Sequence, residues 1–285
     1  MPDESRVMAA RIKPARARRR PERRQNSELG ARVGTAIPLI ALALFLVIEG
    51  GIVFSLGLFV IGCVCMHELY AMYARAHPAR LPGFLALGGL LAAAQYGDQV
   101  QILLAAVIAL PVVFAFTMLQ PRPSVAGLMV TLLGIYWIGF ALATAILLRN
   151  LPHGLGILID VLVGTFLGDT GAYFGGHLFG RRPLAPSISP NKTVEGLLVG
   201  MGAAVLGVWL ASRYQHWLPG SHALVLGVGV ALVAPIGDLF ESFVKREAGV
   251  KDSGRVFGVH GGALDRLDAA LFAVVVGYYI WLAYV

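Results

Sequence analysis

The residues best suited to chemistry gather near the C-terminus, in the polar stretch VKDSGRVFGVHGGALDRLDA at 250–269. Asp265 and Asp268 are three positions apart, so a helix would carry both carboxylates on one face. Asp238 belongs to the preceding apolar segment and must reach the same region from a different helix. Asp169 lies about two turns inside another apolar segment, where a carboxylate is costly in lipid unless it is paired, hydrated or bound to metal.

Carboxylates that converge from separate helices beside Lys and Arg suit Mg²⁺. This ion is held by a few carboxylates and completed by substrate phosphate oxygens. Gly261 and Gly262 precede a helix N-terminus, whose N–H groups and dipole attract anions. Taken singly, an acid at a helix start has a plainer reading as a helix cap, and a base at a helix end as a membrane anchor; Asp169 is the exception. Together they predict a phosphate-handling site at a membrane surface.

The elements that position these residues are apolar helices. The chain is 57% hydrophobic and only 14% charged, whereas soluble domains average about 25% charged residues. We therefore predict an all-α, polytopic integral membrane protein with about nine spans, most of them long enough to cross roughly 30 Å of hydrocarbon and the third short. The expected spans are 33–49, 51–73, 82–96, 100–119, 124–148, 154–175, 193–212, 222–243 and 263–285.

Charge predicts the orientation of these spans. Residues 1–32 hold ten Lys or Arg against four Asp or Glu, which is typical of a disordered cytoplasmic tail. Nine spans then leave 21 of the 23 Lys and Arg residues on the side of the tail, with only Arg149 and Arg213 opposite. The N-terminus is expected inside and the C-terminus outside. Residues 33–150 form an N-terminal group of about five helices, and 151–285 a catalytic group of about four.

The segment from Ser242 to Asp268, SFVKREAGVKDSGRVFGVHGGALDRLD, resembles the signature of the phosphatidate cytidylyltransferases (CDP-diacylglycerol synthases). Its matching features are a Ser followed by Lys-Arg, Lys-Asp, His-Gly-Gly and Asp-Arg-x-Asp at fixed spacing. GDTGAYFGG from Gly168, SPNKTVEG from Ser189 and GDLFES at 237–242 are similar to further stretches of that family. Ala263 departs from it, because a bulkier apolar residue usually follows His-Gly-Gly there.

The resemblance implies a membrane nucleotidyltransferase that joins CTP and phosphatidic acid, giving CDP-diacylglycerol and pyrophosphate in phospholipid biosynthesis. The implied catalytic residues are Asp238, Asp265, Lys251, Arg266 and Asp268. The implied substrate-binding residues are Asp169, Ser189, Lys192, Thr193, Lys245, Arg246, His260, Gly261 and Gly262. Mg²⁺ is expected on Asp238 and Asp265, with Asp169 as a further candidate ligand and K⁺ as a candidate second ion.

The expected partners are CTP, phosphatidic acid and the lipid bilayer, with a second copy of the chain as a further candidate and no nucleic acid. The expected location is the inner (plasma) membrane of the cell, with the site facing the cytoplasm. A lipid phosphate is already largely ionised near pH 7. It needs no general base, which argues against that role for His260.

Three alternatives stay open at this point. A related CTP-dependent enzyme on another lipid, such as a CDP-archaeol synthase, would carry a similar site, and so would a polyprenol kinase. An ion-coupled transporter would also contain intramembrane acids, although it is expected to place them near the bilayer midplane.

Overall fold

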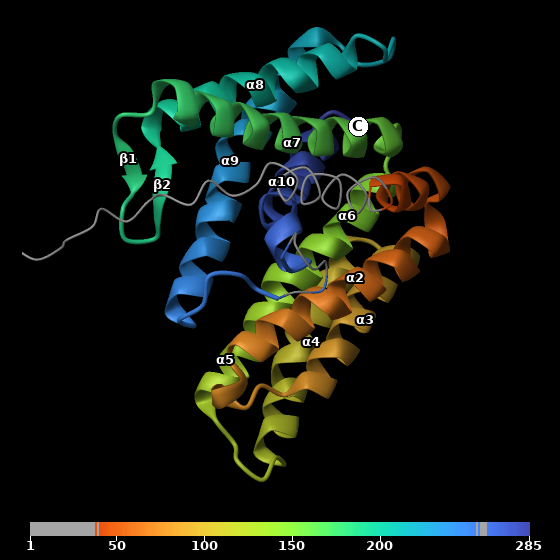
Figure 1. The fold of residues 1–285 in the computed structure, drawn as a ribbon. Coiled ribbons are helices and arrows are strands. Elements are labelled where there is room, and N and C mark those ends of the chain that lie inside the picture. Colours follow the sequence, from red (N-terminus) through yellow and green to blue (C-terminus); the bar gives the residue numbers. More distant parts are fainter. Residues whose placement is uncertain (1–37, 39, 255, 257–260) are drawn as a thin grey trace, which may run out of the picture.

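A computed structural model describes residues 38, 40–254, 256 and 261–285. The expected basic tail and His260 lie outside the described residues. The protein is predominantly helical (Figure 1). Six described helical segments are long and apolar enough to cross a bilayer: Gly51–Met72, Gln99–Met118, Val125–Asn150, Gly154–Phe179, Val194–Ser212 and Gly220–Glu247.

The other three expected spans correspond to helices that differ from these six. Ile40–Glu49 is short in the described part of the chain, and α3 has only 17 residues. In α10 the first two turns contain Asp265, Arg266 and Asp268, so the helix combines an apolar body with a charged start. The structure therefore establishes a helical membrane protein. The expected number of nine crossings stays a prediction.

The N-terminal group consists of α2 (Gly51–Met72), η2 (Ala74–Ala76), α3 (Arg80–Tyr96), α4 (Gln99–Met118), α5 (Val125–Leu133), η3 (Gly134–Gly139) and α6 (Phe140–Asn150). Local sequence determines several of its helix starts. Asp98 accepts the Val100 N–H at 2.7 Å, and Gln101 bonds back to the Asp98 N–H at 2.9 Å. This is a capping box, and it fixes the first turn of α4.

The C-terminal group consists of α7 (Gly154–Phe179), β1 (Pro183–Ala185), β2 (Ser189–Thr193), α8 (Val194–Ser212), α9 (Gly220–Glu247) and α10 (Leu264–Leu282). Helices α7 and α8 make the most extensive contact in the molecule. A Cβ added at Gly196 would lie 2.7 Å from the Ala172 carbonyl oxygen, and one at Gly200 would lie 2.7 Å from that of Gly168. These small residues therefore let the two backbones touch.

Helix α10 connects the two groups, because it packs against α9 and α7 on one side and α6 on the other (Figure 1). Its far end approaches the α6–α7 connection, where the Trp281 Nε1–H donates to the Pro152 carbonyl at 2.7 Å. Leu264 and Ala273 of α10 are fully buried. The charged start of α10 is thus held against the core by the apolar residues around it.

The prediction of an all-helical chain is wrong at one place, the connection between α7 and α8. Strands β1 and β2 pair antiparallel there, with Pro183 opposite Thr193 and Ala185 opposite Ser189. In Figure 1 this hairpin projects beyond the ends of α7 and α8 and runs beside α9. Arg246 of α9 donates from Nε to the Ile188 carbonyl at 3.1 Å, so the hairpin turn is tied to the end of α9.

Candidate active site

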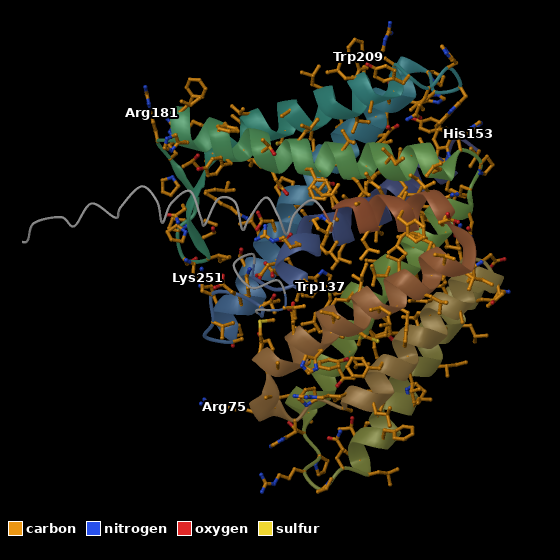
Figure 2. All side chains as sticks on the ribbon, turned by 45° about the vertical axis from the view of Figure 1, so that its right-hand side comes forward. Arg75, Trp137, His153, Arg181, Trp209 and Lys251 are labelled. Carbon is orange, nitrogen blue, oxygen red and sulfur yellow. The ribbon has the colours of Figure 1, made fainter. Side chains whose placement is uncertain are left out.

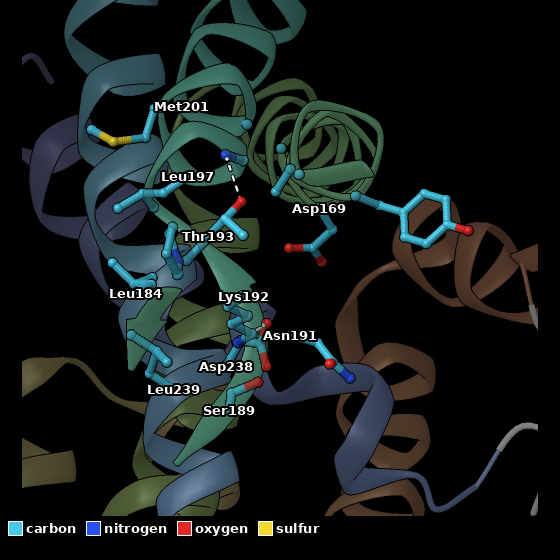
Figure 3. A pocket seen from close by; sticks show the side chains of 18 of the residues that line it. Asp169, Leu184, Ser189, Asn191, Lys192, Thr193, Leu197, Met201, Asp238 and Leu239 are labelled. Carbon is cyan, nitrogen blue, oxygen red and sulfur yellow. Dashed lines mark hydrogen bonds and ion pairs between the residues drawn. The ribbon is translucent and has the colours of Figure 1, made fainter. Parts of the chain in front are cut away.

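Four carboxylates from three helices line one cavity of about 640 Å³: Asp169 of α7, Asp238 of α9, and Asp265 and Asp268 of α10. Asp169 is exposed to this cavity, which resolves the problem of a charge two turns inside an apolar helix. Figure 3 shows Asp169 and Asp238 facing the same space from opposite sides. The convergence that the sequence predicted is therefore present.

The hairpin closes the other side of the cavity. Ser189, Asn191, Lys192 and Thr193, all from β2, line it (Figure 3). The Lys192 ammonium forms an ion pair with the Asp238 carboxylate, and both side chains stay about a third exposed, at 28% and 34%. A cation and an anion thus face a water-accessible space, where phosphate oxygens can reach the ammonium group.

The start of α8 determines how the hairpin sits. Thr193 caps α8, since its Oγ1 accepts the Gly196 N–H at 3.1 Å. Glu195, in the first turn, accepts the N–H groups of Arg181 and Arg182 at 3.0 and 3.1 Å. Both ends of the hairpin are therefore fastened to one helix N-terminus, where negative charge is favourable. This fastening places Lys192 over the cavity.

A buried ionic cluster lies directly behind the cavity. The Lys245 ammonium donates to Asp265 Oδ1 at 2.6 Å and also pairs with Glu241, which is only 1% exposed. The Asp265 carboxylate further accepts the Gly262 N–H at 2.8 Å and the Ser253 N–H at 3.1 Å. Lys245 is thus committed to protein carboxylates, and every Asp265 oxygen already accepts a protein hydrogen bond.

Among the described residues that line the cavity, acids outnumber bases, with four Asp beside Lys192 and His177. Asp268 has unfavourable electrostatic interactions with both Asp238 and Asp169. Lys192 acts favourably on Asp169, and Lys245 acts favourably on Asp268. Carboxylates crowded in this way are stabilised by a bound cation. The excess of acid over base is therefore an observation that fits a divalent ion at this place.

The donor chemistry also fits Mg²⁺, which prefers carboxylate oxygens and retains several open positions for water and phosphate. Among the described residues, no three acidic, His or Cys side chains are close enough together to form a complete metal site by themselves. One or two carboxylates supplemented by substrate oxygens are consistent with that spacing.

The remaining predicted residues within the described part of the chain lie outside the cavity lining. Arg246 binds carbonyl oxygens of Ile188 and Val250. Lys251 and Arg266 are exposed, and Lys251 lies on the hairpin side of the molecule (Figure 2). Gly261 adopts a positive φ of 81°, a conformation that suits glycine. Their predicted substrate contacts remain predictions.

Sequence reasoning missed three residues. Asn191 lines the cavity, and Glu241 completes the ionic cluster, yet both stood inside quoted motifs without an assigned role. Glu68 of α2 is 3% exposed and accepts the Leu264 N–H at 3.0 Å. A single carboxylate inside the apolar stretch 51–73 was a usable signal, because an ionisable residue within a membrane span indicates function by default.

Comparison with known proteins identifies the family. The profile of the cytidylyltransferase family matches residues 30–284. A protein of Brucella suis named phosphatidate cytidylyltransferase is 34% identical over 258 residues, covering 88% of this chain and 93% of its own length. One of Bacillus subtilis with the same name is 33% identical over 267 residues, covering 89% and 97%. The chain, a membrane nucleotidyltransferase, therefore belongs to the cytidylyltransferase family.

Proposed function

We propose that this chain is a phosphatidate cytidylyltransferase, which transfers CMP from CTP to phosphatidic acid and releases pyrophosphate. One structural observation carries the proposal: Asp169, Asp238 and Asp268 line a single cavity together with Lys192, as joining two anionic substrates around a cation requires. The names of the relatives from Brucella suis and Bacillus subtilis support the same substrate.

The proposed placement is the inner membrane of the cell, with nine spans, the N-terminus and active site in the cytoplasm, and the C-terminus outside. Arg181 and Lys251, both expected inside, lie on the hairpin side of the molecule in Figure 2, whereas His153 lies on the opposite side. The Trp281–Pro152 hydrogen bond brings the end of α10 to that opposite side. These positions support the topology, because positive charges concentrate on the cytoplasmic face.

Repulsion between substrates is the first obstacle, since a phosphomonoester carries about −1.5 to −2 near pH 7 and CTP is also strongly anionic. Lys192 is the cation best placed to bind their phosphate oxygens, because its side chain remains 28% exposed beside the cavity. Ser189 and Asn191 supply uncharged hydrogen-bonding groups next to it. The lipid phosphate oxygen attacks the α-phosphorus in line, and pyrophosphate departs.

Asp238 and Asp265 are the proposed Mg²⁺ ligands, and Asp169 is a candidate to replace one of them. Asp238 and Asp169 face the cavity, whereas ligation by Asp265 would exchange one of its protein hydrogen bonds. When bound there, Mg²⁺ supplies charge neutralisation on the reacting phosphate and on the leaving pyrophosphate. K⁺ is the proposed second ion.

An apolar groove of about 400 Å³ adjoins the cavity between α8 and α9. Met201 lines both, and Val205, Leu206, Trp209 and Leu224 continue the groove away from the carboxylates. We assign one acyl chain of phosphatidic acid to this groove. The phosphate of the lipid would then lie at the cavity while the acyl chain stays among apolar side chains. This arrangement positions the phosphate oxygen that acts as the nucleophile.

Purified protein incubated with labelled CTP, phosphatidic acid and Mg²⁺ tests the proposal. We expect CDP-diacylglycerol and pyrophosphate in equal amounts. Formation of CDP with a newly phosphorylated lipid would identify a kinase instead. A preference for an ether-linked isoprenoid lipid over phosphatidic acid would move the assignment to a CDP-archaeol synthase.

A further inference from the structure

Glu68 is buried in α2, far in sequence from the candidate active site, and yet it contacts the segment that holds the active site together. Its Oε1 accepts the Ala263 N–H at 3.0 Å, and its Oε2 accepts the Leu264 N–H at 3.0 Å. The Ser253 hydroxyl lies 3.0 Å from the same Oε2. A buried carboxylate is stable only when it is hydrogen-bonded in this way.

These contacts substitute for a cap that α10 lacks. The N-cap residue of α10 is Ala263, which has no side-chain acceptor for the first free N–H groups. The carboxylate of Glu68 supplies that acceptor from another helix, and its negative charge meets the positive end of the helix dipole. The N–H groups that the sequence predicted to meet a phosphate are therefore occupied by the protein's own anion.

Two glycines make the close approach of Glu68 possible. A Cβ at Gly254 or at Gly262 would collide with the Glu68 carboxylate, and one at Gly262 would also collide with the Ser253 hydroxyl. The backbone on both sides of the 255–260 segment therefore lies directly against one side chain of α2. Glu68 therefore holds the described backbone at Ser253 and at Ala263 and Leu264.

Asp265 shares a hydrogen-bonding partner, Ser253, with Glu68. The Ser253 hydroxyl lies 3.0 Å from Asp265 Oδ2 as well as 3.0 Å from Glu68 Oε2, and its single proton serves one carboxylate at a time. Asp265 also accepts the N–H groups of Ser253 and Gly262, whose positions Glu68 determines. Asp265 is thus oriented by groups that Glu68 holds.

We propose that Glu68 is a positioning residue for cytidylyl transfer, acting through Ser253 and the start of α10 to orient Asp265 beside the cavity. The N-terminal helices then take part in the active site rather than only surrounding it. The inference rests on the proposed function, because its effect is measured as turnover of CTP and phosphatidic acid.

The main test is Glu68→Gln in the full-length protein, assayed for CDP-diacylglycerol formation. The amide keeps the size of the side chain but presents a donor where two acceptor oxygens are needed. We expect kcat per folded molecule to fall roughly ten- to hundredfold, the effect of one or two charge-assisted hydrogen bonds. KM for CTP should stay within about threefold, as expected when an interaction acts on the chemical step.

Three further measurements separate positioning from a merely structural role. Hydrogen exchange followed by mass spectrometry should show faster exchange at the Ala263 and Leu264 amides in Glu68→Gln. Ser253→Ala should lower kcat by itself and add little in the Glu68→Gln background, because the two residues act on Asp265 together. Glu49→Gln, the same change at an exposed position of the first described helix, should leave kcat and exchange unaltered.

A merely structural Glu68 would lower the yield and the unfolding midpoint while kcat per folded molecule stayed at the wild-type value. That result, or strictly additive effects of the two variants, overturns the inference. If Glu68→Gln does not fold, Ser253→Ala becomes the test. A wild-type kcat in Ser253→Ala would then overturn the inference. A wild-type protein that makes no CDP-diacylglycerol would instead contradict the proposed function. Failure of the inference about Glu68 and failure of the proposed function are therefore distinguishable.

Discussion

Replacing Asp238 by Asn gives a sharp test of the candidate site, because we expect a large loss of activity with almost no change in stability. The substitution keeps the shape of the side chain and removes one negative charge from the cavity. In the native protein that charge pairs with Lys192 and opposes the charges of Asp169 and Asp268.

The two contributions to stability are small and opposite in sign. Both partners of the Lys192–Asp238 pair are about a third exposed, and pairs of this kind contribute about 0–1 kcal/mol. Relief of repulsion from Asp169 and Asp268 offsets that loss. We therefore expect the free energy of unfolding to change by less than about 1 kcal/mol and the unfolding midpoint by less than about 4 °C.

Activity should respond very differently. Asp238 is a proposed metal ligand and pairs with Lys192 at the cavity. Removing a group that stabilises charge in the transition state typically costs roughly 10²–10³-fold in kcat. Turnover of labelled CTP and the unfolding midpoint are measured on the same purified sample. Asp98→Asn is the matched control, because Asn caps a helix as well as Asp does and Asp98 lies at the start of α4.

A large loss of stability with turnover preserved would refute this reasoning. It would mean that Asp238 has a structural role and that the excess of negative charge at the cavity is balanced by some other group. Equal turnover in Asp238→Asn and wild type would remove Asp238 from the proposed metal site.

Further predictions follow from the other parts of the site. Asp265→Asn should abolish turnover and also destabilise the protein by about 2–4 kcal/mol, because Asp265 is a hub of buried charge-assisted hydrogen bonds; an unchanged unfolding midpoint would contradict this. Gly202→Leu should lower kcat/KM for dioleoyl relative to dihexanoyl phosphatidic acid by roughly tenfold, since Gly202 lines the apolar groove and a Cβ added there has no atom within 4 Å. Gly89→Leu, which is equally free of contacts, is its control, and equal chain-length selectivity in both variants would exclude the groove. Removing residues 1–25 should leave specific activity mostly unchanged in correctly inserted protein, and a collapse of activity would show that the tail takes part.

The helical framework could be predicted from the sequence, and the limits of that prediction are local. Apolar runs of membrane length predict helices directly, because the N–H and C=O groups of the backbone find no hydrogen-bond partner in lipid and must pair within the helix. The β1–β2 hairpin was not predicted, since Pro183–Ala185 is only three residues long. Its contacts are also distant in sequence, because Glu195 holds the residues before β1 and Arg246 holds the turn.

The sequence by itself identified the candidate residues that line the cavity. Asp169, Asp238 and Lys192 stand out because charged groups are rare in an apolar chain and are costly to bury in lipid. Only the tertiary structure decided which charged residues line the cavity and which hold its neighbours in place. Lys245 serves Asp265 and Glu241, and Glu68 caps α10 from α2. Such partnerships join residues up to 196 positions apart, and they follow from helix packing, which no local pattern of residue types records.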